Sequence, residues 1–261
     1  MDKTLVKGVQ LLEHLLQAGV PCGVSELARQ TGLNPSNVHR TLQTWAHLGF
    51  VAQDAVSGQY HCTLRLFEWG CRVADGIDVR RAAREPLARL ARETQETIHL
   101  SVLDGAEIVY LEKIDSPQPV RAYSEIGGRA PAHCVATGKA LLAHGGSAAL
   151  ATLADPLPRP TAHTVANLAA LRLQLETARR DGYAVNREEW RPGVSGLGAP
   201  VYDATGRAIA AAGLTAPTAR LDEPRMHTLG RALAATAQDI TRALGGRAPQ
   251  QAANSTPQET A

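Results

Sequence analysis

The chain has 261 residues, a formal net charge of +2 and 44% hydrophobic residues. This length allows two domains with cores of their own. No apolar run is long enough to cross a bilayer, and the first ten residues lack the apolar region of a signal peptide, so we expect a cytoplasmic protein with no membrane partner. The cysteines form no Cys-x-x-Cys pair, which argues against a disulfide framework and a zinc site.

Three short helical patterns open the chain. Residues 4–18 are amphipathic, with Leu5, Val9, Leu12 and Leu16 predicted to face the core. A second pattern covers residues 24–30, and the third begins at Asn34-Pro35, an N-cap residue followed by a proline, which is a strong helix-start signal.

The third pattern divides into an apolar and a polar face. Val38, Leu42 and Trp45 lie at helical spacing and are predicted to face a core. A helix that enters the major groove of DNA needs an opposite face that can form hydrogen bonds. Taken alone, the same division suits a surface helix in any helical domain. The residues on the polar face are Ser36, Asn37, Arg40, Gln43, Thr44 and His47.

A predicted hairpin follows these helices. Phe50-Val51 and residues 60–64 flank a turn at Ser57-Gly58. Three helices followed by a hairpin indicate a winged helix-turn-helix domain over residues 1–64, in which the hairpin is a wing that contacts the DNA backbone.

These residues resemble the DNA-binding domain of the IclR-type bacterial transcriptional regulators. The shared motifs are the ELA helix at Glu26, the S-x-V-x-R recognition helix from Ser36 to Arg40, and the GxY wing strand at Gly58. The resemblance implies a regulator that binds a pseudo-palindromic operator in double-stranded DNA as a dimer or a dimer of dimers. We expect the DNA contacts to come from Ser36, Asn37, His39, Arg40, Gln43, Ser57 and Gln59.

Charge gives this prediction little support. Residues 1–65 hold five basic and four acidic side chains, a net charge of +1, where a nucleic-acid-binding domain usually carries a basic patch. Four histidines in this region can add positive charge near a polyanion, and a dimer doubles the footprint.

Residues 65–77 are predicted to form a linker helix between two domains. Leu66, Trp69 and Val73 form one apolar stripe, and Phe67 and Cys71 belong to a second. A helix with two apolar faces packs on two surfaces, one of which is then available to a partner subunit. The alternative is a helix buried within one domain.

The second domain is predicted to span residues 78–244 and to be α+β. Helical patterns alternate with strands and hairpins, and residues 245–261 lack periodicity and are predicted to be a disordered tail. The helical patterns cover residues 78–94, with a break or kink at Pro86, and residues 135–144, 168–180 and 221–244. The strands are predicted at residues 98–102, 108–111, 120–123, 183–185, 198–202 and 207–214.

This half resembles the IclR effector-binding domain, a GAF-like sensor fold. The segments IGGRAPAHCVATGKALLA, GYAVNREEWRPGV and GAPVYDATGRAIAA have the order and spacing of the family. The resemblance implies a pocket for a small carboxylated metabolite, lined by Val135, Ala136, Asn186, Gly196, Gly213 and Thr215. Glycine at 196 and 213 and asparagine at 186 depart from the family's usual cysteine, serine and aspartate. The two glycines imply a ligand larger than, or oriented differently from, a two-carbon acid, and Asn186 removes a negative charge and so suits an anion better. The alternative is that these small residues merely allow close packing.

Residues 112–131 resemble the branch of the family that senses sugar acids such as 2-keto-3-deoxygluconate. This segment can instead serve structure or dimerisation. A sugar acid is therefore one candidate for the small organic acid effector.

Enzyme motifs are incomplete. Gly138-Lys139 lacks the other residues of a phosphate-binding loop, Ser195 lacks the last glycine of a nucleophile elbow, and Glu188 and Glu189 are adjacent and would point different ways on a strand. We therefore expect no catalytic residues, no metal and no cofactor. An enzyme on the sensor fold and a winged-helix protein–protein adaptor remain as alternatives.

Overall fold

The computed structural model describes residues 1–122 and 124–248. They group into two compact units, Met1–Ile77 and a second that begins at Asp78. Most of the predicted tail, residues 249–261, lies outside the described residues. Before it, Gly246 N–H donates to Thr241 O (2.8 Å) and Arg247 N–H donates to Asp203 O (3.3 Å), so the chain stays on the second unit through Arg247.

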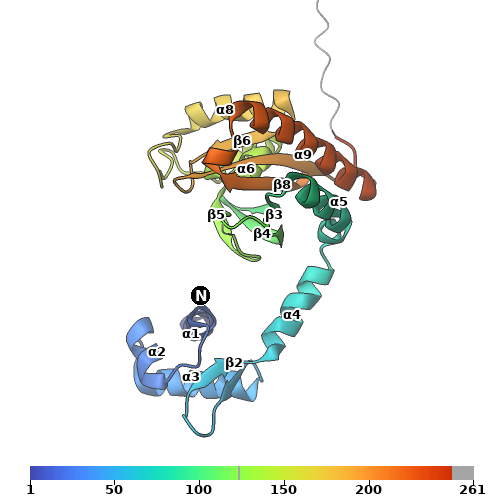
Figure 1. Cartoon of the computed structure of the whole chain (residues 1–261). Helices are drawn as coiled ribbons and strands as arrows, with labels where there is room; N and C mark the ends of the chain where they lie inside the picture. Colours follow the sequence, from blue (N-terminus) through green and yellow to red (C-terminus); the bar gives the residue numbers. More distant parts are fainter. Residues whose placement is uncertain (123, 249–261) are drawn as a thin grey trace, which may run out of the picture. The chain divides into compact units, whose positions relative to one another are not determined.

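The first unit is a three-helix domain with a two-stranded wing and a fourth helix (Figure 1). The Asn34 side chain caps the third helix by accepting a hydrogen bond from Ser36 N–H (2.9 Å), as the sequence predicts. The winged helix-turn-helix is thus confirmed. Its elements are α1 (Lys3–Ala18), α2 (Val24–Thr31), α3 (Pro35–His47), β1 (Val51–Gln53), β2 (Tyr60–Cys62) and α4 (Leu64–Asp75).

The predicted inward face of α1 is wrong. The helix buries Leu11 and Leu15, whereas Leu5 and Leu16 are 63% and 49% exposed. The helix packs on α3 along the side of Gly8, whose carbonyl oxygen accepts the Trp45 indole N–H (3.0 Å). The stripe that was predicted to be core is thus left on the surface.

The second unit is built on a six-stranded antiparallel sheet in the order β5-β4-β3-β8-β7-β6. The α+β prediction is confirmed. The strands are β3 (Thr97–Asp104), β4 (Glu107–Ile114), β5 (Arg129–Pro131), β6 (Ala184–Arg187), β7 (Val194–Tyr202) and β8 (Ala208–Pro217). The helices are α5 (Asp78–Thr94), α6 (Ala136–His144), α7 (Gly146–Leu150), α8 (Leu168–Asp181) and α9 (Glu223–Ala243), with short 3-10 turns at Ala132–Cys134 and Thr218–Arg220.

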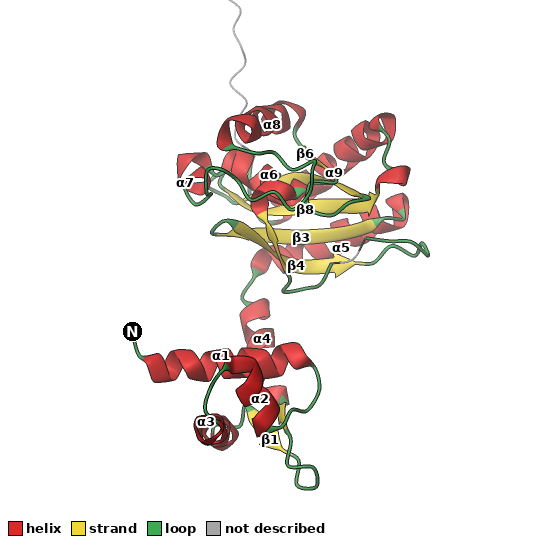
Figure 2. Cartoon of the chain, turned by 90° about the vertical axis from the view of Figure 1, so that its left-hand side faces the viewer, coloured by secondary structure: helices red, strands yellow, loops and turns green. Residues whose placement is uncertain are grey.

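Helices cover both faces of this sheet (Figure 2). α6 and α8 pack on one face, and α5 and α9 pack together on the other. The core between α6, α8 and the sheet contains the fully buried Leu142, Leu171 and Leu175. α6 comes so close to the sheet because Gly198 and Gly213, paired across β7 and β8, have no side chains beneath it.

One predicted strand of this unit is wrong. No strand forms at residues 120–122, because Pro117 and Pro119 interrupt the backbone donors just before it, and residue 123 lies outside the described part. The edge strand is β5 instead, paired with β4. Helix α5 runs from Asp78 to Thr94 with Pro86 inside it, so of the predicted break or kink the break is excluded. The last strands also reach further than predicted, to Val194 and Pro217, and this extension carries Gly196 and Thr215.

Candidate functional site

Helix α3 presents the expected two faces. Val38 and Leu42 are fully buried, whereas Ser36, Asn37, His39, Arg40 and Gln43 are all exposed. No acidic side chain occurs on this helix. The Arg40 guanidinium donates to Asn37 Oδ1 (3.1 Å), so the two predicted contact residues are held next to one another on the outer face.

The wing also holds its predicted contact residues on the surface. Ser57 and Gln59 are exposed beside Gly58, whose φ of 68° turns the chain. The Ser57 hydroxyl and backbone N–H both donate to Asp54 Oδ1 (2.7 Å each), and these hydrogen bonds lower the pKa of the Asp54 carboxyl. The tip of the wing is therefore a turn held by hydrogen bonds.

A cavity of about 230 Å³ lies in the second unit, where the first turn of α6 meets the extended ends of β7 and β8. Five of the six residues predicted for an effector pocket line it, namely Val135, Ala136, Asn186, Gly196 and Thr215. The other lining residues are His99, Tyr110, Ala122, Ser124, Glu125, Gly128, Arg129, Thr137, Trp190, Arg191, Val194 and Leu197.

Gly213, the sixth predicted residue, does not line the cavity. A Cβ at this position would lie 2.5 Å from Thr137 Cγ2 and 3.1 Å from His99 Nδ1. Glycine is therefore required here for packing between α6 and the sheet, and a contact of Gly213 with an effector stays a prediction.

The cavity wall is rich in hydrogen-bonding groups. The first N–H groups of a helix have no partner within it, and Val135, the N-cap residue of α6, supplies no side-chain cap. Asn186 Oδ1 accepts the backbone N–H of Glu189 (2.8 Å), which leaves the Asn186 amide NH₂ as a donor. Arg191, at the same wall, supplies positive charge. These groups suit an anionic or hydroxylated ligand.

His99 contributes a neutral imidazole. Its ring is buried, stands 5.2 Å from the Tyr110 ring, and shares a 3.0 Å hydrogen bond between Nε2 and Thr215 Oγ1. Burial, aided by the charge of Lys113, lowers the pKa of His99 to about 4. Nδ1 has no hydrogen-bond partner among the described residues.

Both units match known domains. The IclR helix-turn-helix domain matches residues 4–55, and the C-terminal domain of the bacterial transcriptional regulator IclR matches residues 71–242. The chain belongs to the IclR family. It is therefore a DNA-binding transcriptional regulator and not an enzyme.

Individual members of the IclR family agree with this assignment. The transcriptional regulator KdgR of Dickeya chrysanthemi is 37% identical over 85% of this chain and 74% of its own length. The Thermotoga maritima IclR structure has a TM-score of 0.80 at 28% identity, covering 94% of this chain and 100% of that one. An IclR homologue from Microbacterium hydrocarbonoxydans, complexed with 4-hydroxybenzoate, also has a TM-score of 0.80, at 27% identity and with 93% and 99% covered.

Sequence reasoning missed several cavity residues of this IclR-family regulator. His99 and Tyr110 lie on β3 and β4, far from the predicted set in the chain. Trp190 and Arg191 follow β6, between the predicted Asn186 and Gly196. His99 lies within the alternation Ile98–Val102, where a polar residue between two apolar ones indicates only a second face of the strand. Register alone brings His99 opposite Gly213 and next to Thr215.

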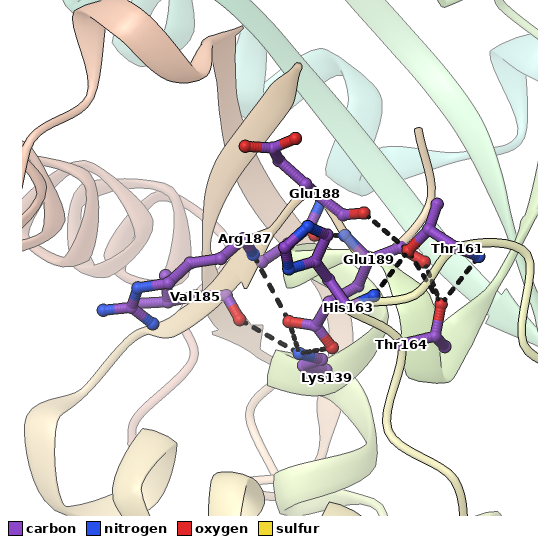
Figure 3. Close-up of polar contacts among 9 residues, drawn as sticks. Lys139, Thr161, His163, Thr164, Val185, Arg187, Glu188 and Glu189 are labelled. Carbon is purple, nitrogen blue, oxygen red and sulfur yellow. Dashed lines mark hydrogen bonds and ion pairs between the residues drawn. The ribbon is translucent and has the colours of Figure 1, made fainter. Parts of the chain in front are cut away.

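Two motifs that looked like incomplete enzyme sites meet in the fold. Lys139 and Glu189 form a buried ion pair, in which Lys139 Nζ lies 2.5 Å from both carboxylate oxygens (Figure 3). Among the described residues, no group of three or more His, Cys, Asp and Glu side chains could hold a metal ion. In the same part of the chain, no helix is long and apolar enough to cross a membrane.

Burial of His99 predicts a loss of stability in acid. The unfolded imidazole titrates near 6.5 and the folded one at about 4, so the folded state binds fewer protons between these values. The folded state therefore has its full free energy of unfolding above pH 6.5. About 3 kcal/mol of this free energy is lost as the pH falls towards 4. The melting temperature should therefore fall less between pH 7 and pH 4.5 in His99→Gln than in the wild type. Equal pH dependence in both proteins would contradict a neutral buried His99.

Proposed function

We propose that the regulator binds a pseudo-palindromic operator through α3 and the wing, and that a small organic acid in the cavity biases the arrangement of its DNA-binding domains. The observation that carries the DNA half is the division of α3, whose polar face is wholly exposed while Val38 and Leu42 are wholly buried. A regulator of this kind works on the chromosome, so we place it in the cytoplasm.

A dimer is the assembly we propose for operator binding. None of the side chains described on α4 is buried, and Leu64, Phe67 and Val73 are 76%, 69% and 70% exposed. Large apolar side chains exposed in this way along one helix are typical of a surface that a partner covers. A second copy of the same helix would cover it, and a two-fold dimer presents two recognition helices to two half-sites. A dimer of dimers is the alternative assembly.

A carboxylate is the effector group that the cavity suits best. The unpaired N–H groups at the start of α6 and the helix dipole favour negative charge, and the Asn186 amide is a further donor. The volume of about 230 Å³ is below the ~300–1,000 Å³ that drug-sized ligands occupy, which favours a small metabolite.

A sugar acid is the effector we propose first. The segment whose sequence resembles the sugar-acid-sensing branch supplies Ala122, Ser124, Gly128 and Arg129 to the cavity wall. Ser124 Oγ is buried without a hydrogen-bond partner among the described residues, and His99 Nδ1 likewise. Hydroxyl groups on the effector would satisfy both atoms. An aromatic acid such as 4-hydroxybenzoate, the ligand of the Microbacterium homologue, is the second candidate.

Ligand-induced stabilisation tests the effector half of this proposal. A ligand present at 100 times its dissociation constant stabilises the folded state by about 2.7 kcal/mol. We would measure the melting temperature of the full-length protein with 2-keto-3-deoxygluconate, with 4-hydroxybenzoate and with the neutral analogue of each. One of the two acids should raise the melting temperature, and its neutral analogue should not. Equal shifts with acid and neutral analogue would remove the carboxylate from the proposal.

The Thr215 hydroxyl should support effector binding. Thr215→Val removes the hydrogen-bond partner of His99 Nε2 and a hydroxyl of the cavity wall, which should weaken binding about tenfold or more. DNA affinity of the effector-free protein should not change. Thr215→Ser, which keeps the hydroxyl, is the matched control. If Thr215→Val binds the effector with an unchanged dissociation constant, the effector does not contact this wall of the cavity.

A further inference from the structure

The Lys139–Glu189 ion pair joins two walls of the effector cavity. Lys139 lies on α6, one turn beyond the cavity-lining residues Val135–Thr137. Glu189 lies in the segment after β6, directly before the cavity-lining Trp190 and Arg191. The two side chains are 1% and 5% exposed, so this is an interior contact rather than a surface pair.

Each member of the pair also holds backbone groups. Lys139 Nζ donates to Val185 O (3.1 Å), and Glu189 Oε1 accepts the N–H of Arg187 (3.3 Å). Figure 3 shows the ammonium between the carboxylate and the end of β6. Since these bonds have defined directions, they fix where the segment leaves the strand.

The segment after β6 also accepts hydrogen bonds from the loop that contains Thr161 and Thr164. Thr161 Oγ1 donates to Glu188 O (2.8 Å), and Thr164 Oγ1 donates to Glu189 O (2.7 Å; Figure 3). Glu188 adopts a left-handed φ of 59°, and its carboxylate accepts the N–H of Gly193 (2.7 Å). A non-glycine residue in this conformation persists only where its surroundings enforce it.

A buried ion pair is an inefficient way to gain stability, because both charges must be removed from water. Replacing such a pair by apolar residues is often neutral or stabilising, whereas removing one partner is strongly destabilising. What an apolar pair cannot supply is the set of directional bonds to Val185 and Arg187. The pair therefore has a use that packing alone would not fulfil.

We propose that Lys139 and Glu189 are positioning residues of the effector site, which hold residues 187–193 so that Trp190 and Arg191 close one wall of the cavity. The inference rests on the proposed function, in that this cavity binds the effector. Trp190 is partly buried against the core between α6 and α8, so displacement of the segment would uncover its ring.

Trp190 itself reports on the proposal. In the full-length protein with Trp45→Phe and Trp69→Phe it is the sole tryptophan of three, and acrylamide quenching measures its exposure without any effector. Glu189→Gln should raise the quenching constant about twofold through local opening. The apolar variant Lys139→Met/Glu189→Leu should unfold at or above the temperature of the starting protein and yet keep the raised quenching constant.

The matched control is Glu223→Gln. It breaks the exposed ion pair that Arg187 forms from the same strand, and should leave Trp190 quenching unchanged. The proposal is overturned if the apolar variant restores both stability and Trp190 protection, because the pair would then only fill the core. It is also overturned if folded Glu189→Gln protects Trp190 as the starting protein does. Should Glu189→Gln not fold, the apolar variant decides.

Failure here and failure of the effector proposal are separate results. Unchanged Trp190 quenching rejects the positioning role and leaves effector binding to the thermal-shift experiment. Raised quenching, in a protein that neither organic acid stabilises, supports the positioning of the segment and rejects these two acids as effectors.

Discussion

Arg40→Ala should weaken specific operator binding about 100-fold or more while the protein stays folded. Arg40 is the only lysine or arginine of α3 and is exposed on its outer face. A bidentate contact of arginine to a base is worth about 1–3 kcal/mol, and a dimer loses two such contacts, so the affinity should fall about 100-fold or more. Fluorescence anisotropy with the native upstream DNA at fixed salt measures this loss.

The matched control for charge is Arg81→Ala. Arg81 is an exposed arginine on α5 with one ion-pair partner, Asp78, so its removal changes net charge by the same amount away from the recognition helix. The control should bind DNA as the wild type does. If Arg40→Ala binds the operator with unchanged affinity at the same salt, α3 does not read the DNA through this residue.

Gly198→Ala should strongly destabilise the effector-binding domain, although it adds only one methyl group. A Cβ at this position would lie 2.4 Å from the carbonyl carbon and oxygen of Ala136 and 2.5 Å from Thr137 N. These are backbone atoms at the start of α6, so no side-chain rotation relieves the overlap and the helix must move. We expect a loss of about 3 kcal/mol, or roughly 6–12 °C in melting temperature.

The effect on function should follow from the same displacement. The start of α6 supplies the N–H groups proposed to bind the effector carboxylate, so Gly198→Ala should also weaken effector binding. Gly105→Ala is the control, since no atom lies within 4 Å of its Cβ position and only its φ of 62° is unfavourable. It should cost about 1 kcal/mol and leave effector affinity intact. Equal melting temperatures for the two variants would contradict the close contact at Gly198.

Local signals in the sequence predicted most of the first domain. The Asn34-Pro35 start and the spacing of Val38 and Leu42 define α3, because capping and burial of one helical face are short-range effects. The face of α1 was not predictable in this way. Two apolar stripes compete on that helix, and the contact between Gly8 and Trp45, 37 residues away in the chain, decides between them.

The cavity proposed for the effector was only partly predictable for the same reason. Family resemblance led to Asn186, Gly196 and Thr215, which line the cavity. It did not reveal that Gly213 packs against α6, because whether a glycine faces a cavity or a helix depends on which atoms lie across from it. The ion pair between Lys139 and Glu189 joins residues 50 positions apart, and no local pattern relates them.

The measurement that tests the account most directly is fluorescence anisotropy of the full-length protein on its native upstream intergenic DNA and on a scrambled sequence. A salt series from about 50 to 200 mM separates phosphate contacts from base contacts. We predict at least ~10³-fold tighter binding to the native fragment, steep weakening by salt, and a change of affinity when the stabilising organic acid is added. Absence of salt-dependent binding to either DNA, with and without a metabolite pool, would contradict the assignment of this chain as an operator-binding regulator.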